Sequence, residues 1–348
     1  MPTSESPDAP RIAIVGATGA VGTTLARLIE ERGFAYRSVS LVASARSAGR
    51  ELPLDGAAHP VHALDGFDFS TVDLAFFSAG TGTSQEWVPA ATAAGALVID
   101  NTNAFRMDPD TPLVVPQVNP EQLDRRPVSG VIANPNCSTI PLVRLLRPVQ
   151  HAAGLREVVV STYQAASGRG LTGIEELRED TRRALAEPGQ EPLAKEFTPS
   201  LAFDVLPSID RPLADGFTLE EQKMRQESQK ILGLPHLDLT ATCVRVPVVN
   251  GHSEAALVRT ERPLERAELV ELLAAAEEVT VHDRELLGAF PTPRTVGDRP
   301  DHVHVGRIRV TPQDPRSFWL WIVADNLRIG AALNAIQIAE ELRRRGTL

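Results

Sequence analysis

The chain has 348 residues, a net charge of −10 and an apolar fraction of 43%. These values are typical of a globular protein with two domains. The acidic balance and the lack of a basic run exclude nucleic acid as an expected partner. No apolar stretch approaches the length of a membrane span, so no membrane association is expected. Residues 1–10 lack a signal-peptide core and are predicted to be a disordered lead-in. The two cysteines, Cys137 and Cys243, lie in unlike contexts, which indicates a reducing cytoplasm.

A strand, a glycine-rich turn and a helix follow the lead-in. The apolar run Arg11–Val15 enters Gly16-Ala-Thr-Gly-Ala-Val-Gly22, and a helical pattern extends from there to about Arg32. This is the context of a dinucleotide-binding loop, because glycines let the backbone approach the pyrophosphate and the helix N-terminus binds it. The spacing differs from the commoner Gly-x-Gly-x-x-Gly, and a plain tight turn is the alternative.

The end of the next expected strand, Ser38–Ala43, indicates which dinucleotide binds. Chains that bind NAD usually place Asp or Glu there to hold the ribose hydroxyls. This chain has Ser44-Ala-Arg46-Ser47 instead. An arginine without an acid suits a 2′-phosphate, so NADP is predicted in preference to NAD. A solvated loop is the alternative interpretation.

Alternating strands and helices predict a doubly wound sheet through about residue 135. The expected elements are the strands Val72–Phe77, Leu97–Asp100 and Leu113–Val115, and the helix Ser84–Ala94. Ligands of such sheets gather where strands end. One such end leads into a loop with Gly80, and another into a polar loop with Arg106. Taken alone, Arg106 could equally be a surface charge.

Cys137 lies in the sequence Asn134-Pro-Asn-Cys-Ser-Thr139, between the apolar run Gly130–Ala133 and a helical pattern over Thr139–His151. Asn and Ser favour helix N-caps, so the cysteine is expected at or just before a helix N-terminus. Free N–H groups and the helix dipole there lower the pKa of a thiol below its usual value of about 8.5, and they can hold an oxyanion. The polar neighbours argue against a buried, inert cysteine and predict a nucleophile.

Longer strands dominate the second half of the chain. Strands are expected over Glu157–Tyr163, Leu239–Val249, Ala255–Arg259, Val303–Val310 and Ser317–Ala324. Helices are expected over 171–187, Leu219–Leu232, Leu264–Glu278 and Leu327–Arg345, and 188–217 is expected to be irregular. The predicted fold is α/β, with a Rossmann-type NADP-binding domain of residues 11–136 and 326–348. Residues 137–325 are predicted to form an α+β domain with a mostly antiparallel sheet.

Seven stretches, in this order, resemble the aspartate-β-semialdehyde dehydrogenases. They are Gly16–Gly22, Asn134–Thr139, Tyr163–Gly168, Glu220–Met224, Arg245–Val248, Gly251–Glu254 and Asp325–Arg328. The resemblance covers nearly the whole chain after Pro10. It implies NADP-dependent reductive dephosphorylation of L-aspartyl-4-phosphate to L-aspartate 4-semialdehyde, in lysine, threonine and methionine biosynthesis. It also implies no metal, a catalytic and dimerisation role for residues 137–325, and a homodimer that associates to a tetramer in some members.

The resemblance gives three residues catalytic roles. It implies that Cys137 attacks the acyl phosphate to form a thioester, which divides one hard displacement into two easier steps. It makes His252 the acid/base group that takes the thiol proton and later returns it, and it makes Gln164 the residue that orients the acyl group. A lone histidine after a strand is otherwise more often structural.

The resemblance also implies how the charged substrate is held. Arg245 matches the residue that binds the carboxylate, and Glu220 the residue that binds the ammonium. Lys223, Arg106 and Asn136 match the phosphate contacts. From spacing alone, Glu220 and Lys223 would be an exposed i,i+3 ion pair, and Arg245 would belong to an ion pair on a strand surface.

The NADP contacts implied by the resemblance are Gly16, Thr18, Gly19, Ala20, Val21, Gly22, Ser44, Arg46, Ser47, Gly80, Ser167, Gly168 and Asn326. Among them, Ser167, Gly168 and Asn326 match nicotinamide contacts. The chain departs from the family at Ile329, where lysine is common, at Asp204, where asparagine is frequent, and over 188–200. Cys243 is expected to be structural.

Two rival functions remain open on the sequence. N-acetylglutamyl-phosphate reductase runs the same chemistry, but it typically has Asn-Pro-Gly-Cys-Tyr around its cysteine, and its substrate has no free ammonium for Glu220 to bind. A non-catalytic NADP-binding relative would keep the fold without the activity. Loss of the cysteine or the histidine would indicate such a relative, and Cys137 and His252 are both present.

Overall fold

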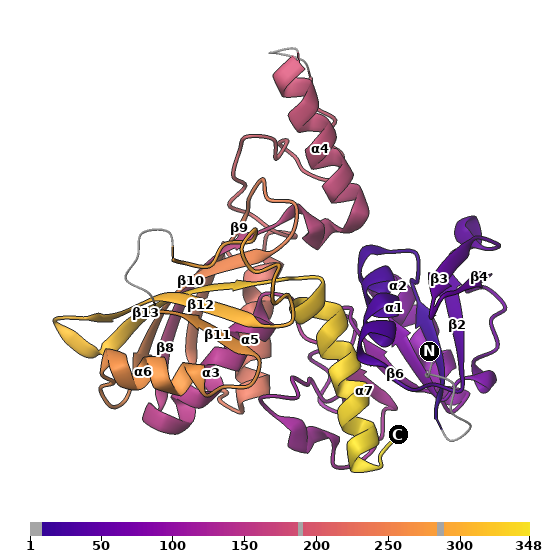
Figure 1. Ribbon diagram of the computed structural model, residues 1–348, viewed down its shortest axis with the longest axis horizontal. Coiled ribbons are helices and arrows are strands. Elements are labelled where there is room, and N and C mark those ends of the chain that lie inside the picture. The colour runs from indigo at the N-terminus through magenta and orange to yellow at the C-terminus, as the bar shows by residue number, and fades with distance from the viewer. Residues whose placement is uncertain (1–8, 187–190, 284–288) are drawn as a thin grey trace. The chain divides into compact units, whose positions relative to one another are not determined.

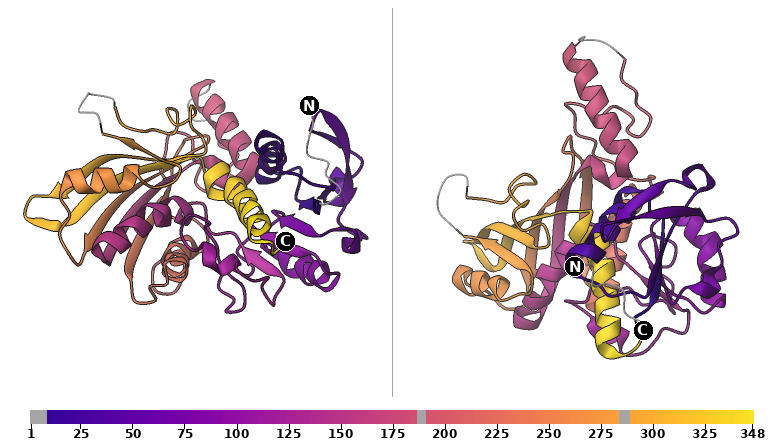
Figure 2. Two further views of the ribbon diagram at one scale, coloured as in Figure 1. Left: turned by 60° about the horizontal axis from the view of Figure 1, so that its bottom comes forward. Right: turned by 45° about the vertical axis from the view of Figure 1, so that its right-hand side comes forward.

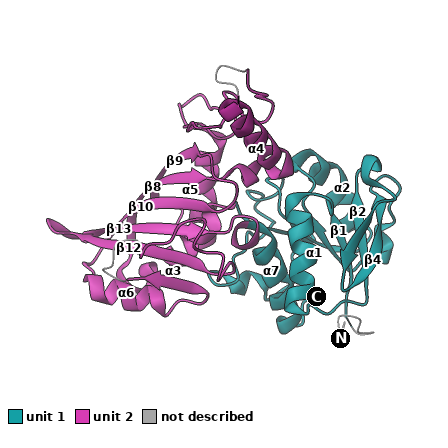
Figure 3. Ribbon diagram, turned by 45° about the horizontal axis from the view of Figure 1, so that its top comes forward, with its two compact units in different colours: residues 1–136, 331–348 teal, residues 137–330 magenta. Residues whose placement is uncertain are grey.

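The computed structural model describes residues 9–186, 191–283 and 289–348. The chain divides into two compact units, unit 1 with residues 1–136 and 331–348, and unit 2 with residues 137–330 (Figure 3). None of the described helices is both long and apolar enough to cross a bilayer. Most of the predicted lead-in, residues 1–8, lies outside the described residues.

Unit 1 contains a seven-stranded sheet in the order β3-β4-β2-β1-β5-β6-β7 (Figure 1). Its strands are β1 (Arg11–Val15), β2 (Ser38–Ala43), β3 (Glu51–Leu54), β4 (Ala57–Ala63), β5 (Leu74–Phe77), β6 (Leu97–Asp100) and β7 (Val131–Ala133). Every pair from β4 to β7 is parallel, and only β3 runs antiparallel to its neighbour. The strand order reverses between β1 and β5, which is the point where such sheets bind ligands.

Three helices accompany this sheet: α1 (Ala20–Arg32), α2 (Thr81–Ala93) and α7 (Leu333–Arg345). The connections through α1 and α2 lead in opposite directions along the sheet, and right-handed crossovers therefore put these helices on opposite faces. Val88 of α2 is buried in one cluster with Val15 and Phe77. Helix α7 packs beside α1.

Unit 2 contains a six-stranded sheet in the order β11-β12-β13-β10-β8-β9. Its strands are β8 (Leu155–Gln164), β9 (Asp238–Arg245), β10 (His252–Thr260), β11 (Val279–His282), β12 (Val303–Thr311) and β13 (Asp314–Ala324). The three central pairs are antiparallel, and the two outer pairs are parallel. The packed helices are α3 (Thr139–Ala153), α5 (Leu219–Leu232) and α6 (Arg266–Ala274), which lie together against the sheet (Figure 2).

Helix α4 (Gly170–Ala186) extends away from the sheet of unit 2 (Figure 1). Two buried carboxylates of α4 accept hydrogen bonds from residues 193–200, which follow the helix in the chain. Glu176 accepts hydrogen bonds from the backbone N–H groups of residues 195–197. Asp180 accepts from the N–H of Leu193 and the hydroxyl of Ser200. These bonds order a segment that has no helix or strand of its own between residues 191 and 217.

The structure confirms the predicted α/β fold and most predicted elements. The bounds of β1, β2, β6 and α5 agree with the prediction. The predicted strand Leu113–Val115 is wrong, because only a single bridge joins Leu113 to Ala133 and the prolines on either side supply no N–H group.

Other differences concern where elements begin and end. Strand β9 stops at Arg245 rather than Val249, two residues before Pro247, and β10 begins earlier than predicted, at His252. The last helix opens as a π-helical turn, Arg328–Ala332, before α7. Helix α6 is shorter than predicted, and β3, β4 and β11 were not anticipated. Residue 187 of the predicted helix 171–187 and residues 188–190 of the irregular segment lie outside the described residues.

We predict that Glu176→Ala loosens the segment beside α4. The substitution leaves three backbone N–H groups without their acceptor, at an expected cost of about 2 kcal/mol in the free energy of unfolding. Local opening should also speed limited proteolysis between residues 191 and 201. The control is Glu175→Ala, at an exposed neighbouring position. Equal urea midpoints and cleavage rates for the two variants would contradict the prediction.

Candidate active site

One edge of the unit 2 sheet gathers three polar side chains. Gln164 and Arg245 are register partners at the ends of the parallel strands β8 and β9. Strand β10 runs antiparallel to β8, so its first residue, His252, lies at the same edge. All three residues are buried. Parallel pairing on one side of β8 and antiparallel pairing on the other therefore assemble the site from two strand ends and one strand beginning.

Cys137 reaches the same edge from the start of α3. The helix begins at Thr139 with Ser138 as its N-cap, which confirms the predicted place of the cysteine, although the Ser138 side chain makes no capping bond. The Cys137 Sγ atom lies 3.3 Å from Nε2 of His252. Cys137 is partly exposed, so the alternative of a fully buried cysteine is wrong. Gly330 approaches it so closely that a Cβ atom there would lie 2.7 Å from Cys137 Cβ.

His252 is held through both ring nitrogens. Its Nδ1 atom accepts a hydrogen bond of 3.0 Å from the backbone N–H of Ala165, and its Nε2 atom faces Cys137. Burial lowers the pKa of His252 well below its usual value, and the positive charge of Arg245 lowers it further. Both effects disfavour the charged imidazolium form of the ring.

Arg245 makes no strand-surface ion pair of the kind that spacing alone suggested. Its guanidinium is buried, and Nη1 donates a 2.7 Å hydrogen bond to the carbonyl of Ala165. Gly168 makes room for this group, because a Cβ atom at that position would lie 2.5 Å from Nη1. A buried arginine fork at the sheet edge is suited to bind a carboxylate.

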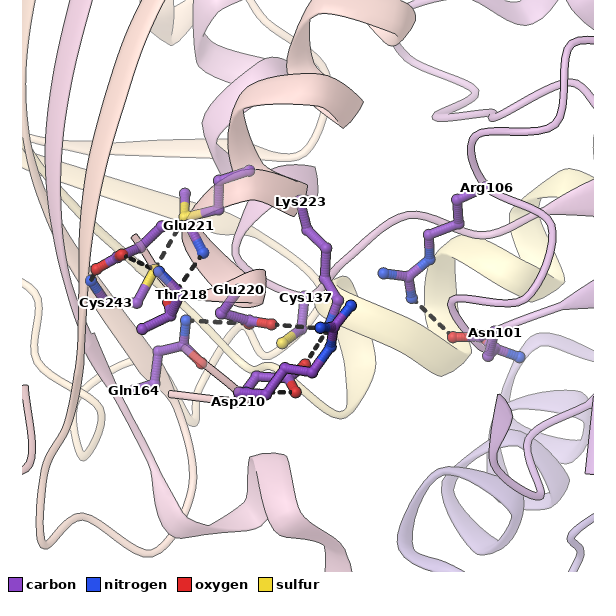
Figure 4. Close-up of polar contacts among 12 residues, drawn as sticks. Asn101, Arg106, Cys137, Gln164, Asp210, Thr218, Glu220, Glu221, Lys223 and Cys243 are labelled. Atoms are coloured by element: carbon purple, nitrogen blue, oxygen red, sulfur yellow. Dashed lines mark hydrogen bonds and ion pairs between the residues drawn. The ribbon is translucent and has the colours of Figure 1, made fainter. Parts of the chain in front are cut away.

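A chain of polar contacts leads away from Gln164 (Figure 4). The Gln164 amide donates to one oxygen of Glu220 at 3.3 Å, and Lys223 donates to the other oxygen at 3.2 Å. Lys223 also donates to Asp210 at 2.6 Å. The Lys223 side chain is 14% exposed and that of Glu220 7%, so the alternative of an exposed pair is wrong.

Asp210 was not anticipated. Burial alone would raise the pKa of Asp210, but the hydrogen bond and charge of Lys223, together with the Arg211 N–H and the Arg169 charge, hold it below its usual value. The sequence feature that could have indicated Asp210 as a partner of Lys223 is its place as an acid in a proline-rich segment, thirteen positions before the lysine.

Ser167 and Asn326 also come together in unit 2. The Ser167 hydroxyl lies 2.9 Å from the side-chain oxygens of Asn326 and Asn250. The Asn326 oxygen also accepts the N–H of Gly251, and Asn250 donates to Asp325. Asn250 and Asp325 were not among the expected site residues.

The remaining candidates belong to unit 1. Arg106 is buried rather than a surface charge, and it donates to the carbonyl group of Asn134 at 2.9 Å. It also donates to the carbonyl group of Asn101 at 2.8 Å (Figure 4). Asn136 is buried as well. The Asn134 side chain bonds to residues at the start of α7, accepting from Asn334 and donating to the carbonyl of Ala331.

The glycine loop between β1 and α1 packs its backbone closely against the loop after β5. Gly16 has φ +91°, and a Cβ atom there would collide with the Ser78 carbonyl. Gly19 is the N-cap of α1, whose first turn carries no acid, and Thr18 lies 3.5 Å from the Ser47 hydroxyl. Ser44 and Arg46 are exposed in the same turn as Ser47, and Gly80 directly precedes α2. Ala20, Val21 and Gly22 form the first residues of α1.

Cys243 is more deeply buried than Cys137. It is fully buried in β9, and its N–H donates to Glu221. Burial, followed by the nearby carboxylates, raises the pKa of its thiol far above the usual value. Its predicted structural role is confirmed. Among residues 9–186, 191–283 and 289–348, no three His, Cys, Asp or Glu side chains are placed to hold a metal ion.

Two family models match the chain. Residues 11–126 match the NAD binding domain of semialdehyde dehydrogenases, and residues 146–329 match their dimerisation domain. The predicted dinucleotide-binding domain is thus confirmed.

Relatives and solved structures give the same result. The aspartate-semialdehyde dehydrogenase of Aquifex aeolicus is 46% identical over 97% of this chain and 99% of its own length. The aspartate-semialdehyde dehydrogenase of Bacillus subtilis is 42% identical over 96% of this chain and 97% of its own length. The structure of Vibrio cholerae aspartate semialdehyde dehydrogenase II complexed with ASA has a TM-score of 0.93 and 42% identity, covering 97% of this chain and 99% of that one. The structure of the Candida albicans aspartate semialdehyde dehydrogenase with NADP has a TM-score of 0.76 and 25% identity, covering 98% of this chain and 100% of that one. This chain therefore belongs to the aspartate-semialdehyde dehydrogenase family of oxidoreductases.

Proposed function

We propose that the protein converts L-aspartyl-4-phosphate to L-aspartate 4-semialdehyde and phosphate, with NADPH as reductant, as a step toward lysine, threonine and methionine. The observation that carries this proposal is the 3.3 Å contact between Cys137 Sγ and His252 Nε2 at the N-terminus of α3. A thiol beside a helix N-terminus and an imidazole nitrogen is suited to react as a thiolate. The Cys137 sulfur attacks the acyl carbon and forms a thioester as phosphate departs.

Substrate recognition follows from the charges at the sheet edge. Arg245 binds the α-carboxylate, and Glu220 binds the ammonium through a carboxylate already aligned by Gln164. Gln164 also orients the acyl group. Lys223, with Arg106 and Asn136, binds the phosphate, and Asp210 holds the Lys223 ammonium in place until the phosphate arrives. A buried acid for an ammonium group favours aspartyl phosphate over an N-acetylated substrate, and the paired cysteine and histidine favour an enzyme over a non-catalytic relative.

The cofactor residues fit NADPH, which supplies a hydride when bound. Gly16 leaves no space for a side chain against Ser78, and the acid-free N-terminus of α1 suits a pyrophosphate. Arg46 is the residue for the 2′-phosphate. The residues that hold the adenosine and pyrophosphate parts are Gly16, Thr18, Gly19, Ala20, Val21, Gly22, Ser44, Arg46, Ser47 and Gly80. Ser167, Gly168 and Asn326 hold the nicotinamide.

The family model names a dimerisation domain, and we propose a homodimer formed through the open face of the unit 2 sheet. Val159, Leu257 and Trp319 are successive register partners across β8, β10 and β13. Their neighbours Val158, Val258 and Phe318 are buried beneath the helices, so alternation points this row to the opposite face. Tyr163 and Trp321 add an aromatic pair with ring centroids 5.5 Å apart. A half-exposed apolar face of this kind is typical of a subunit interface.

The reaction is tested by NADPH formation from L-aspartate semialdehyde, phosphate and NADP, the reverse direction. Activity should require phosphate, and Cys137→Ser should lower it at least a thousandfold, because a neutral hydroxyl replaces the thiolate. The matched control is Cys243→Ser, at the buried cysteine, whose turnover per folded molecule should stay within about threefold of that of the parent. Turnover of N-acetylglutamate semialdehyde in preference, or full activity of the Cys137→Ser variant, would contradict the proposal.

The cofactor proposal predicts that Arg46→Ala raises KM for NADP about tenfold and leaves KM for NAD unchanged. The substitution removes one charge-assisted contact to the 2′-phosphate, worth about 1.5 kcal/mol. Steady-state assays with both cofactors measure the effect. Arg27→Ala, an exposed arginine on α1, serves as the control. Equal changes for NAD and NADP would assign Arg46 a role other than phosphate recognition.

The interface proposal predicts that Trp319→Glu shifts the protein from dimer to monomer, because a charge would be buried in the apolar row. Light scattering after size exclusion should give the chain mass of 37.6 kDa instead of twice that value. Thr172→Glu on α4 is the exposed control. A dimer that persists at micromolar concentration in a folded Trp319→Glu variant would place the interface elsewhere.

A further inference from the structure

Glu254 is a buried acid that the proposed function does not use. The residue is 1% exposed, and neither of its carboxyl oxygens has a hydrogen-bond partner among the residues that the structure describes. A buried carboxylate ordinarily pairs with a cation or accepts several N–H groups, because an unpaired buried charge is costly. An ion pair therefore does not explain why this acid lies in the core.

The pairing of the strands places Glu254 beside Thr162. The two residues are register partners in β10 and β8. Both are buried on the face that the helices cover, together with Val160 and Ala256, which lie two positions along the strands. Side chains directly opposite each other on one face have Cβ atoms about 5 Å apart. The Thr162 hydroxyl has the thiol of Cys243 as a weak partner and no other among the described residues.

Three oxygen atoms on two neighbouring side chains thus have no strong protein partner. Internal water is the usual partner of such groups, and one buried water makes about three hydrogen bonds. We propose that Glu254 and Thr162 hold an internal water molecule, and that Glu254 is an uncharged carboxylic acid. This water site lies in the row of side chains directly behind Gln164 and His252, outside the residues proposed to bind substrate and cofactor.

The surroundings of Glu254 favour the uncharged form. Burial raises its pKa well above the usual value. Arg144 binds Glu278, and Arg245 binds a backbone carbonyl. The buried charged or titratable groups on its own strand and on the elements that cover this face or pair with β8 are Cys243 and Arg245 of β9, Glu220, Glu221 and Glu227 of α5, Arg144 of α3 and His252 of β10. Most of the acids among them would repel a second negative charge.

An uncharged Glu254 couples folding to one proton. In the unfolded chain a glutamate ionises with a pKa of about 4.3, whereas the folded chain keeps the proton to higher pH. Below about pH 4.3 the residue is protonated in both states, and it adds no pH dependence. Above that pH only the unfolded state loses the proton. The unfolding equilibrium constant should therefore rise about tenfold per pH unit until the folded residue ionises as well.

Urea unfolding of the full chain at several pH values, at one protein concentration, tests the charge state. Glu254→Gln keeps the size and polarity of the side chain but cannot ionise. Between about pH 5.5 and 7.5, the unfolding constant of the parent should rise relative to that of the variant by about tenfold per unit. Glu175→Gln, at an exposed position, should follow the parent. Parallel pH curves for the parent and Glu254→Gln would overturn the proposal.

Infrared spectroscopy examines the same group in the folded protein. A protonated carboxyl group has a C=O stretching band distinct from the bands of ionised carboxylates. At neutral pH the spectrum of Glu254→Gln should lack one such band that the parent has. The comparison of two spectra is needed because burial also raises the pKa of Asp100. Loss of carboxylate bands in its place would show that Glu254 is charged and would overturn the proposal.

A crystal structure of the parent protein tests the water directly. The water should lie about 3 Å from a carboxyl oxygen of Glu254 and from the Thr162 hydroxyl. In solution, Thr162→Val should raise the unfolding constant of the parent about tenfold, but that of Glu254→Met less than threefold, because the second protein has already lost the water. The contact with Cys243 is lost equally in both backgrounds and cancels. Well-defined density without this water, or equal effects of Thr162→Val in both backgrounds, would overturn the proposal. None of these measurements depends on turnover, so failure of the proposed function would be seen separately.

Discussion

The site depends on the register of three strands. Gln164 and Arg245 face each other because β8 and β9 are parallel and end together, and His252 joins them because β10 is antiparallel to β8. A slip of one residue in β10 would turn His252 to the opposite face of the sheet. Long apolar runs on both sides of the register, such as Val158–Val160 against Leu257 and its neighbours, penalise such a slip. The hydrophobic pairing of the sheet therefore determines the geometry of the chemistry at its edge.

Burial at this edge makes every charge depend on a partner. Lys223 lies between Glu220 and Asp210, and Arg245 is held by a backbone carbonyl. Isolated charges would be costly there, and Lys223 and Arg245 each have a hydrogen-bonded neighbour. The same low polarity lowers the pKa of His252 and strengthens its contact with the Cys137 sulfur. Substrate groups enter an environment whose dipoles are already oriented, which is the usual source of catalytic stabilisation.

The features that could be predicted from the sequence are local ones. The glycine loop before α1 and the cap-type residues around Cys137 each lie within a few residues of chain. Those signals predicted a helix after the glycine loop and gave Cys137 its place before α3. The capping box that the structure shows at Thr218 and Glu221 is a local signal of the same kind. The hairpin β3–β4 was missed because its two strands contain Pro53, Pro60 and several alanines, which are poor strand formers.

The features that could not be predicted depend on contacts between distant positions. Asp210 lies in an irregular loop and contacts Lys223, and no pattern of apolar residues in the sequence predicts this contact. The Ala165 N–H has no sequence signature at all, since every residue except proline carries one. Resemblance to known enzymes named most candidate side chains, but it could not show that the backbone N–H of Ala165 donates to Nδ1 of His252. The contacts of such backbone groups can be identified only once the pairing of the strands is known.

The thioester at Cys137 is the central claim, and trapping it is the most direct measurement. The enzyme is mixed with aspartyl phosphate without NADPH, quenched in acid within a second and analysed by peptide mass spectrometry. The account predicts an aspartyl adduct on the peptide containing Cys137, one phosphate released per adduct, and loss of the adduct when NADPH is added before the quench. Phosphate release without an adduct, or an adduct on another residue, would contradict it.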